Sequence, residues 1–252
     1  MSTLKVSPKA FGLSILLLAG AAMMPADEVS DWNQIMLEAT LVATPTIPAT
    51  PAPISTRSTA IVEAAVFDAV NGIDPKYAPI FVRDAGPHEA SKRAAAVQAA
   101  YAILIRLYPA QSDTLAQQRS ASLMRIARGW SAERSESIQK GVEWGQKVAD
   151  AIWAWRSNDG MNTVTPPFTG GTATGEWRPT PPKFAPGLAP QLARVTPWVI
   201  KSPSQFRPPA PPALDSLEYA VDFNETKVMG NSSSNSRTPD DTSFALFWQA
   251  GN

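Results

Sequence analysis

The chain of 252 residues contains no cysteine and a single histidine, His88. Disulfides, cysteine nucleophiles and cysteine-ligated metals are therefore excluded. Zinc, copper and iron sites are built mainly from histidine and cysteine, so one histidine cannot assemble such a site. No G-x-S-x-G elbow accompanies His88, which follows Pro87 in a polar stretch. We therefore interpret His88 as an exposed surface residue rather than a catalytic one.

Charge of either sign is not in excess, because 22 Lys and Arg side chains balance 22 Asp and Glu side chains. A neutral chain lacks the electrostatic surface typical of proteins that bind nucleic acid or anionic membranes. The glycine-rich segment Gly170–Gly175 is not followed by the lysine of a phosphate-binding loop, so we interpret it as a turn. An all-carboxylate metal site is left open, although the acids are scattered along the chain, and the Asp240-Asp241 pair suits the first turn of a helix.

The first 26 residues have the organisation of a secretory signal peptide. Lys5 and Lys9 supply a positive start, the apolar centre follows at Leu13–Leu18, and alanines up to Ala26 suit cleavage. An uncleaved membrane anchor is the alternative, but the uncharged run of about 15 residues is shorter than the roughly 20 that a spanning helix needs. We therefore predict an exported protein, periplasmic or secreted, with residues 1–26 as its signal peptide.

The chain does contain a succession of helix patterns, without strand alternation longer than a few residues. Apolar spacing and punctuation by proline and glycine predict amphipathic helices. They are expected at 31–39, 55–70, 88–108, 112–127 and 131–157. Ser55 or Thr56 is expected to cap the second helix, and Asn71-Gly72 to end it. The fold class predicted is therefore all-α, with an amino-terminal helical bundle over residues 27–160.

The last of these helices carries a seam at the spacing that suits antiparallel bundle packing. Its members are Ile138, Val142, Gly145, Ala149 and Ile152. Beyond it, residues 161–212 include thirteen prolines, which break helices and inner strands. Because Trp177 and Trp198 are unusual in disordered chains, we predict an ordered, irregular wrap or connector over the bundle rather than a disordered linker.

Residues 213–252 are expected to begin a further helical region. Helix returns from Leu214 to about Val228, and a polar loop follows. Thr238-Pro239-Asp240-Asp241 then combines a cap, a proline at the first helical position and acids in the first turn. This combination predicts a helix that starts next to Thr238.

Three charges interrupt the apolar helix expected over residues 55–70, namely Arg57, Glu63 and Asp68. A charge in a core needs a partner. A functional site is one interpretation, but we favour a structural ion pair with another helix, because structural networks also use such residues. Arg57 and Asp68 cannot pair with each other, since three helical turns separate them by about 16 Å.

Several short segments form an ordered set along the chain. They are Arg57 to Asp74, Leu107-Tyr108-Pro109, Arg156-Ser-Asn-Asp159-Gly160, Gly175-Glu-Trp177-Arg-Pro179, Ser204-Gln205-Phe206-Arg207-Pro208, and Arg237-Thr-Pro-Asp-Asp-Thr242 with Phe247-Trp248. In this order the set resembles the amino-terminal half of bacterial vanadium-dependent haloperoxidase-like proteins, in the type 2 phosphatidic acid phosphatase superfamily. The resemblance implies helical bundles. In full-length relatives it implies halide oxidation by peroxide with bound vanadate, or phosphate ester hydrolysis.

The resemblance also implies an oxyanion site made of three motifs, K-x6-R-P, P-S-G-H and S-R-x3-G-x-H. Their cations would neutralise vanadate or phosphate, as a dense anion requires. None of the three is in this chain: five residues rather than six separate Lys201 from Arg207-Pro208, and Ser236-Arg237 lacks the later glycine and histidine. In the family these motifs lie in the second half, beyond the segment that matches up to Trp248.

The sequence therefore predicts a truncated member of this family that lacks the second helical half of the fold and is inactive by itself. No catalytic, cofactor-binding or metal-binding residue is assigned in this chain, and vanadate is implied only for full-length relatives. The expected partner is the missing carboxy-terminal half or a second copy of the chain. The alternative is a non-catalytic exported helical interaction module. A hydrolase that uses Asp or Glu has no motif in its favour.

Overall fold

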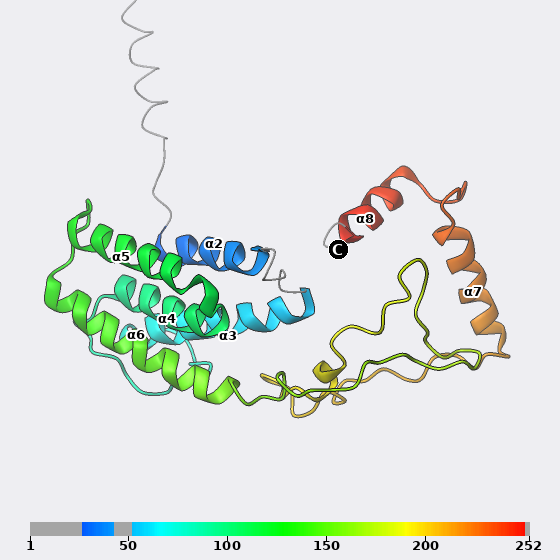
Figure 1. The fold of residues 1–252 in the computed structure, drawn as a ribbon, viewed down its shortest axis with the longest axis horizontal. Helices are drawn as coiled ribbons and strands as arrows, with labels where there is room; N and C mark the ends of the chain where they lie inside the picture. Colours follow the sequence, from blue (N-terminus) through cyan, green and yellow to red (C-terminus); the bar gives the residue numbers. More distant parts are fainter. Residues whose placement is uncertain (1–26, 43–51, 250–252) are drawn as a thin grey trace, which may run out of the picture. The chain divides into compact units, whose positions relative to one another are not determined.

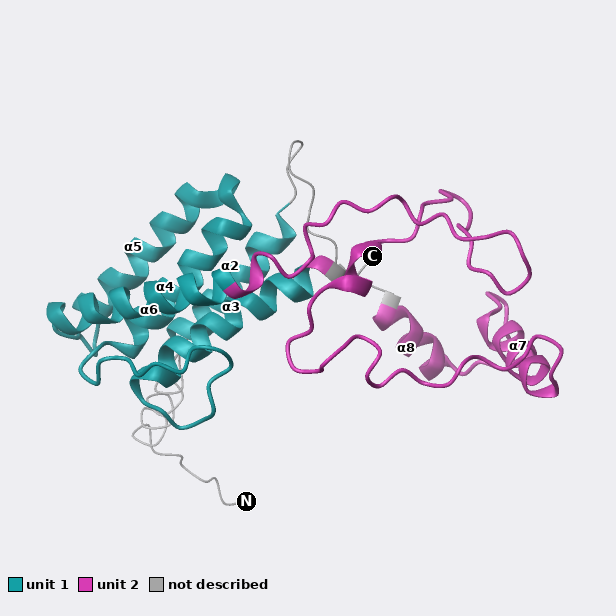
Figure 2. Cartoon of the chain, turned by 90° about the horizontal axis from the view of Figure 1, so that it is seen from below, with its two compact units in different colours: residues 1–50, 55–154 teal, residues 51–54, 155–252 magenta. Residues whose placement is uncertain are grey.

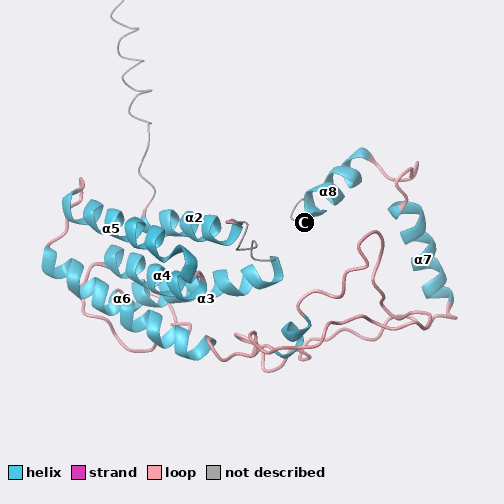
Figure 3. Ribbon diagram, viewed as in Figure 1, coloured by secondary structure: helices cyan, strands magenta, loops and turns pink. Residues whose placement is uncertain are grey.

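The computed structural model describes residues 27–42 and 52–249, and the chain divides into two compact units (Figure 2). Unit 1 comprises residues 1–50 and 55–154, and unit 2 comprises residues 51–54 and 155–252. Helices dominate the described residues, whose only strand-like pairing is an isolated bridge between Phe168 and Gly187 (Figure 3). The predicted all-α fold is confirmed. The expected signal peptide lies outside the described residues.

The described part of unit 1 is a helical bundle (Figure 1). Its helices are α2 (Glu28–Leu41), α3 (Ala52–Ile73), α4 (Lys92–Leu107), the short 3-10 helix η1 (Pro109–Gln111), α5 (Ser112–Arg128) and α6 (Ser135–Arg156). The first residues of α3 and the last residues of α6 belong to unit 2. The alanine-rich α4 packs against α2 and α5, and most of its side chains are buried. Small side chains let neighbouring backbones approach α4 closely, so this helix forms the centre of the core.

Helix α6 approaches α4 through two glycines. A Cβ atom on Gly145 would lie 3.0 Å from the Ala95 Cα and closer still to the Ala95 carbonyl oxygen, and Gly141 meets the Ser91 carbonyl in the same way. Gly145, Ala149 and Ile152 are buried, whereas Ile138 and Val142 are half-buried. The seam predicted from sequence therefore faces the core, most tightly along its carboxyl-terminal half.

Some predicted helix ends are wrong. Helix α3 begins at Ala52, before Ser55 and Thr56, and continues through Asn71 and Gly72 to Ile73. Gly72 serves packing rather than termination, because a Cβ there would lie 2.6 Å from the Trp144 indole. Helix α4 begins at Lys92 rather than His88, because the Ser91 hydroxyl caps it by accepting the Ala94 N–H at 3.0 Å.

Further along the chain, α5 matches its predicted range, and α6 begins at Ser135 rather than at Ser131. Ser131 instead lies in the loop between α5 and α6, where its carbonyl oxygen accepts a hydrogen bond from Arg93 at 3.1 Å. This contact leaves Ser131 outside the helix.

Unit 2 contains irregular chain, the short 3-10 helix η2 (Pro190–Arg194), α7 (Leu217–Gly230) and α8 (Pro239–Gln249). Helix α8 starts as predicted. The Thr238 hydroxyl accepts the Asp241 N–H at 3.1 Å, and the Asp241 carboxylate accepts the Thr238 N–H at 3.0 Å. Such reciprocal capping satisfies amide groups that the helix itself leaves open.

Residues 161–212 are irregular, as expected. Their predicted position over the bundle stays a prediction. Among the helices described, none combines the length and the hydropathy that crossing a bilayer requires.

Candidate functional site

Two polar side chains near the end of α3 hold the loop that follows it. The Asp68 carboxylate is 1% exposed and accepts three successive backbone N–H groups, of residues 80–82, each at 2.8 Å. The Asn71 carboxamide accepts the N–H groups of residues 76 and 77 at 3.0 Å. The structural interpretation of Asp68 is therefore retained, but its partners among the described residues are backbone amides, so the ion pair predicted for it is wrong. Arg57 lies half-buried towards the opposite end of α3.

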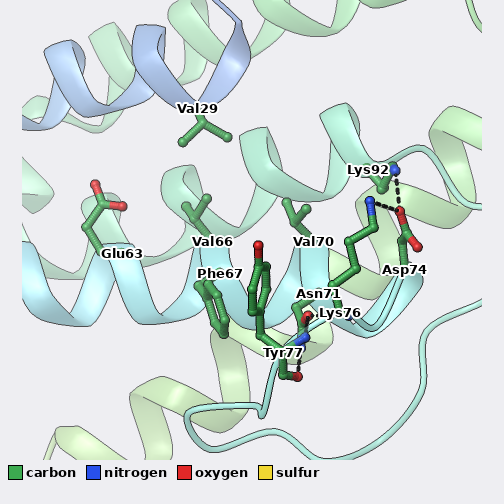
Figure 4. A pocket seen from close by; sticks show the side chains of 10 residues that line it. All are labelled: Val29, Glu63, Val66, Phe67, Val70, Asn71, Asp74, Lys76, Tyr77 and Lys92. Carbon is green, nitrogen blue, oxygen red and sulfur yellow. Dashed lines mark hydrogen bonds and ion pairs between the residues drawn. The ribbon is translucent and has the colours of Figure 1, made fainter.

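A cavity of about 350 Å³ lies beside α3, which we call the α3 cavity (Figure 4). Its lining residues come from α2, α3, the loop after α3 and the start of α4. They are Val29, Glu63, Val66, Phe67, Val70, Asn71, Asp74, Lys76, Tyr77 and Lys92. The Phe67 and Tyr77 rings lie 6.2 Å apart with a 38° tilt. Mostly apolar walls with a few charged groups are typical of small-molecule sites, and this volume is at their lower end.

Charged groups stand at opposite ends of the α3 cavity in Figure 4. At one end, Glu63 is half-buried and makes no hydrogen bond or ion pair with any described residue. Burial raises the pKa of the Glu63 carboxyl, because desolvation disfavours its charged form. At the other end, Asp74 pairs with Lys92 at 2.8 Å and with Lys76 at 3.3 Å. Hydrogen bonds from Lys92 and Lys76 hold the pKa of Asp74 below its usual value.

Sequence reasoning singled out Glu63 but missed the cavity around it. The available signal was a carboxylate on an otherwise apolar helix. The remaining walls come from segments that only the fold brings together, such as Val29 and Lys92. The predicted structural ion pair is wrong for Glu63 as well, as far as the described residues extend.

In unit 2, the Arg156 guanidinium lies against two indole rings, which meet edge to face with their centroids 5.0 Å apart. Its Cζ is 4.3 Å from the Trp198 ring centroid and 5.0 Å from that of Trp155. Arg156 donates to the Asp159 carboxylate at 2.7 Å and to the Thr196 carbonyl at 2.9 Å. Arg156 is fully buried and Asp159 nearly so. We call this set the arginine clasp; it fastens the Thr196–Trp198 segment to the end of α6.

The residues that come nearest to the oxyanion motifs do not form an anion site. Lys201 and Arg207 are exposed. Arg237 donates to two backbone carbonyls at the end of α7, at 2.7 and 3.2 Å, and to the Thr242 hydroxyl at 3.0 Å. Its guanidinium thereby joins α7 to α8 and is not directed at a ligand. These residues do not fit vanadate or phosphate.

The other residues singled out from the sequence lie on the surface, at a helix start or in a turn. His88 is exposed in the turn before α4, which confirms its interpretation as a surface residue. Asp240 and Asp241 lie in the first turn of α8, as expected. Gly170 and Gly175 have positive φ values of 68° and 84°, which suits the predicted turn. Within the described residues, no group of three or more acidic or histidine side chains is placed to hold a metal ion.

Comparisons of the chain with protein-family models, with curated proteins and with solved structures found no match. The resemblance to vanadium-dependent haloperoxidase-like proteins therefore rests on the sequence segments quoted above.

Proposed function

We propose that this chain is the non-catalytic amino-terminal part of a vanadium-dependent haloperoxidase-like protein, or of a phosphate-ester hydrolase of the same superfamily. In this proposal it supplies the helical bundle and a docking surface on α7 and α8. A second helical part, which carries the three oxyanion motifs, covers that surface. The observation that carries the proposal is the exposure of apolar side chains on these two helices.

Helix α8 exposes Phe244, Leu246, Phe247 and Trp248, whose exposed fractions lie between 58% and 72%. The Trp248 ring contacts Phe244 and Phe247, with centroids 6.1 and 5.5 Å apart. Helix α7 buries none of its residues and also exposes large apolar side chains. Short helices are marginal in water without packing, and contiguous exposed apolar surface marks interaction sites. A helical partner would bury these side chains.

Activity assays test the proposal on the purified chain. Vanadate, bromide and peroxide are added with a halogen acceptor, and a phosphate ester is offered in a parallel assay. Turnover at background level is expected in both, because the chain has neither motif histidine. Clear turnover of either kind contradicts the proposal. Co-expression with a helical segment that carries the three motifs should yield a stable complex with measurable activity.

Solution behaviour separates this proposal from a self-sufficient interaction module. A chain with an uncovered α7–α8 surface should bind a hydrophobic dye and self-associate. A monodisperse monomer that melts in one cooperative transition would favour the interaction module instead.

Export is a separate proposal that rests on residues 1–26. It predicts that the mature chain is recovered outside the cytoplasm with a new amino terminus near Asp27. Amino-terminal sequencing of the secreted or periplasmic protein checks this, and recovery of the intact terminus in the cytoplasm contradicts it.

A further inference from the structure

We propose that the α3 cavity binds a small primary ammonium compound with an apolar body, whose cationic group pairs with Glu63. This site lies within unit 1 and does not depend on the proposed function.

The charge of Glu63 is unsatisfied among the described residues. A half-buried carboxylate is stabilised by a cation or by hydrogen-bond donors, and no described residue supplies either to Glu63. The lysines that line the cavity, Lys76 and Lys92, are engaged with Asp74 at the opposite end. A cation brought by a ligand would therefore complete the site at Glu63.

The walls of the α3 cavity are partly aliphatic and partly aromatic. Val29, Val66 and Val70 offer aliphatic surface, and the Phe67 and Tyr77 rings offer aromatic surface to the same space. Apolar walls select a ligand with a hydrocarbon or aryl body, and aromatic rings also attract cations. The volume of about 350 Å³ suits a small molecule rather than a folded partner.

The charges at the two ends of the α3 cavity set the orientation of a ligand. Two lysines and one aspartate leave one net positive charge at the far end of the cavity. That charge repels a ligand ammonium from the Asp74 end and favours its placement at Glu63. Glu63 would in turn repel a carboxylate or phosphate group on the ligand. The ligand that fits the cavity best therefore carries an ammonium group and no anionic group.

Calorimetric titration of the full chain at pH 7 compares 2-phenylethylammonium with 2-phenylethanol, which has a similar body and no charge. The ammonium compound should bind at least about tenfold more tightly, because a charge-assisted hydrogen bond to a partly buried carboxylate adds to the shared apolar contact. Glu63→Gln should abolish the preference. Glu143→Gln, the same change at an exposed position on α6, should preserve it. Circular dichroism melts establish that both variants are folded.

A pH series adds a second readout. The titratable groups that face the cavity are Glu63, Asp74, Lys76, Tyr77 and Lys92. Hydrogen bonds from Lys92 and Lys76 hold the pKa of Asp74 low, whereas burial raises the pKa of Glu63. Binding should therefore weaken towards pH 4 as Glu63 takes up a proton. Equal affinity for both compounds, no binding of either at millimolar concentration, or an undiminished preference in Glu63→Gln would overturn the proposal.

Discussion

At Asp68, one buried carboxylate accepts three successive amide groups of the loop between α3 and α4. Asp68→Asn replaces one acceptor oxygen with a donor, so at least one amide loses its partner. We expect the free energy of unfolding to fall by about 2 kcal/mol, the order of a hydrogen bond to a charged group. Urea unfolding at pH 7, followed by circular dichroism, measures this.

The matched control is Asp84→Asn. Asp84 pairs with Lys147 on the surface, where both side chains are well exposed. Exposed ion pairs contribute about 0–1 kcal/mol, so the control should change stability little. Equal losses in the two variants would show that Asp68 does not anchor the loop.

Glu63 makes stability depend on pH with a definite sign. Burial raises its pKa above the ordinary 4.5, so the folded chain holds this proton more tightly than the unfolded chain does. Its contribution is therefore most favourable below the unfolded pKa and is lost as pH rises through the folded pKa. Glu63→Gln should gain stability relative to the native chain between about pH 4 and pH 7. Urea unfolding of both proteins at pH 4 and at pH 7 checks this. If the difference between their free energies of unfolding is the same at both pH values, the prediction is contradicted.

At the scale of an element, the close approach of α6 to α4 depends on Gly145. A methyl group there would overlap the Ala95 backbone, which cannot rotate away as a side chain could. Gly145→Ala should therefore destabilise the bundle by about 1–3 kcal/mol, the usual cost of overpacking. Thermal unfolding measures the loss. Gly230→Ala is the control, since nothing lies within 4 Å of a Cβ at the end of α7; an unchanged midpoint for Gly145→Ala would contradict the packing.

The arginine clasp depends on a planar cation. Lysine keeps the charge but lacks the flat guanidinium that lies against Trp155 and Trp198. Arg156→Lys should therefore loosen the irregular segment that follows α6 and speed its cleavage in limited proteolysis. Arg207→Lys, at an exposed position, should leave the cleavage rate unchanged. If both variants are cleaved at the native rate, the clasp does not hold the segment.

Sequence patterns predicted helices best where the signal is local. Thr238-Pro239 starts α8 because the capping hydroxyl of Thr238 and the Asp241 N–H that donates to it are three residues apart. The end of α3 could not be predicted in this way, because Gly72 packs on Trp144, which is distant in the chain. The α3 cavity could not be predicted from the sequence for the same reason. Glu63 was identifiable as an unusual charge, but its surroundings are set by tertiary packing.

At the scale of the whole molecule, the two units contrast in how they bury apolar residues. Unit 1 has a core of small and aliphatic side chains, whereas α7 and α8 expose theirs. The double variant Phe247→Ser and Trp248→Ser should lower hydrophobic-dye fluorescence and self-association of the chain. Trp130→Ser is the control, because Trp130 is a fully exposed tryptophan in the loop between α5 and α6. Dye binding that responds equally to both changes would contradict a specific α7–α8 surface.

The nucleotide sequence after codon 252 tests most directly the proposal that a second helical part covers α7 and α8. The proposal predicts that P-S-G-H and S-R-x3-G-x-H are encoded within the next few hundred bases, in any reading frame. A stretch of that length that encodes neither motif in any frame would contradict it.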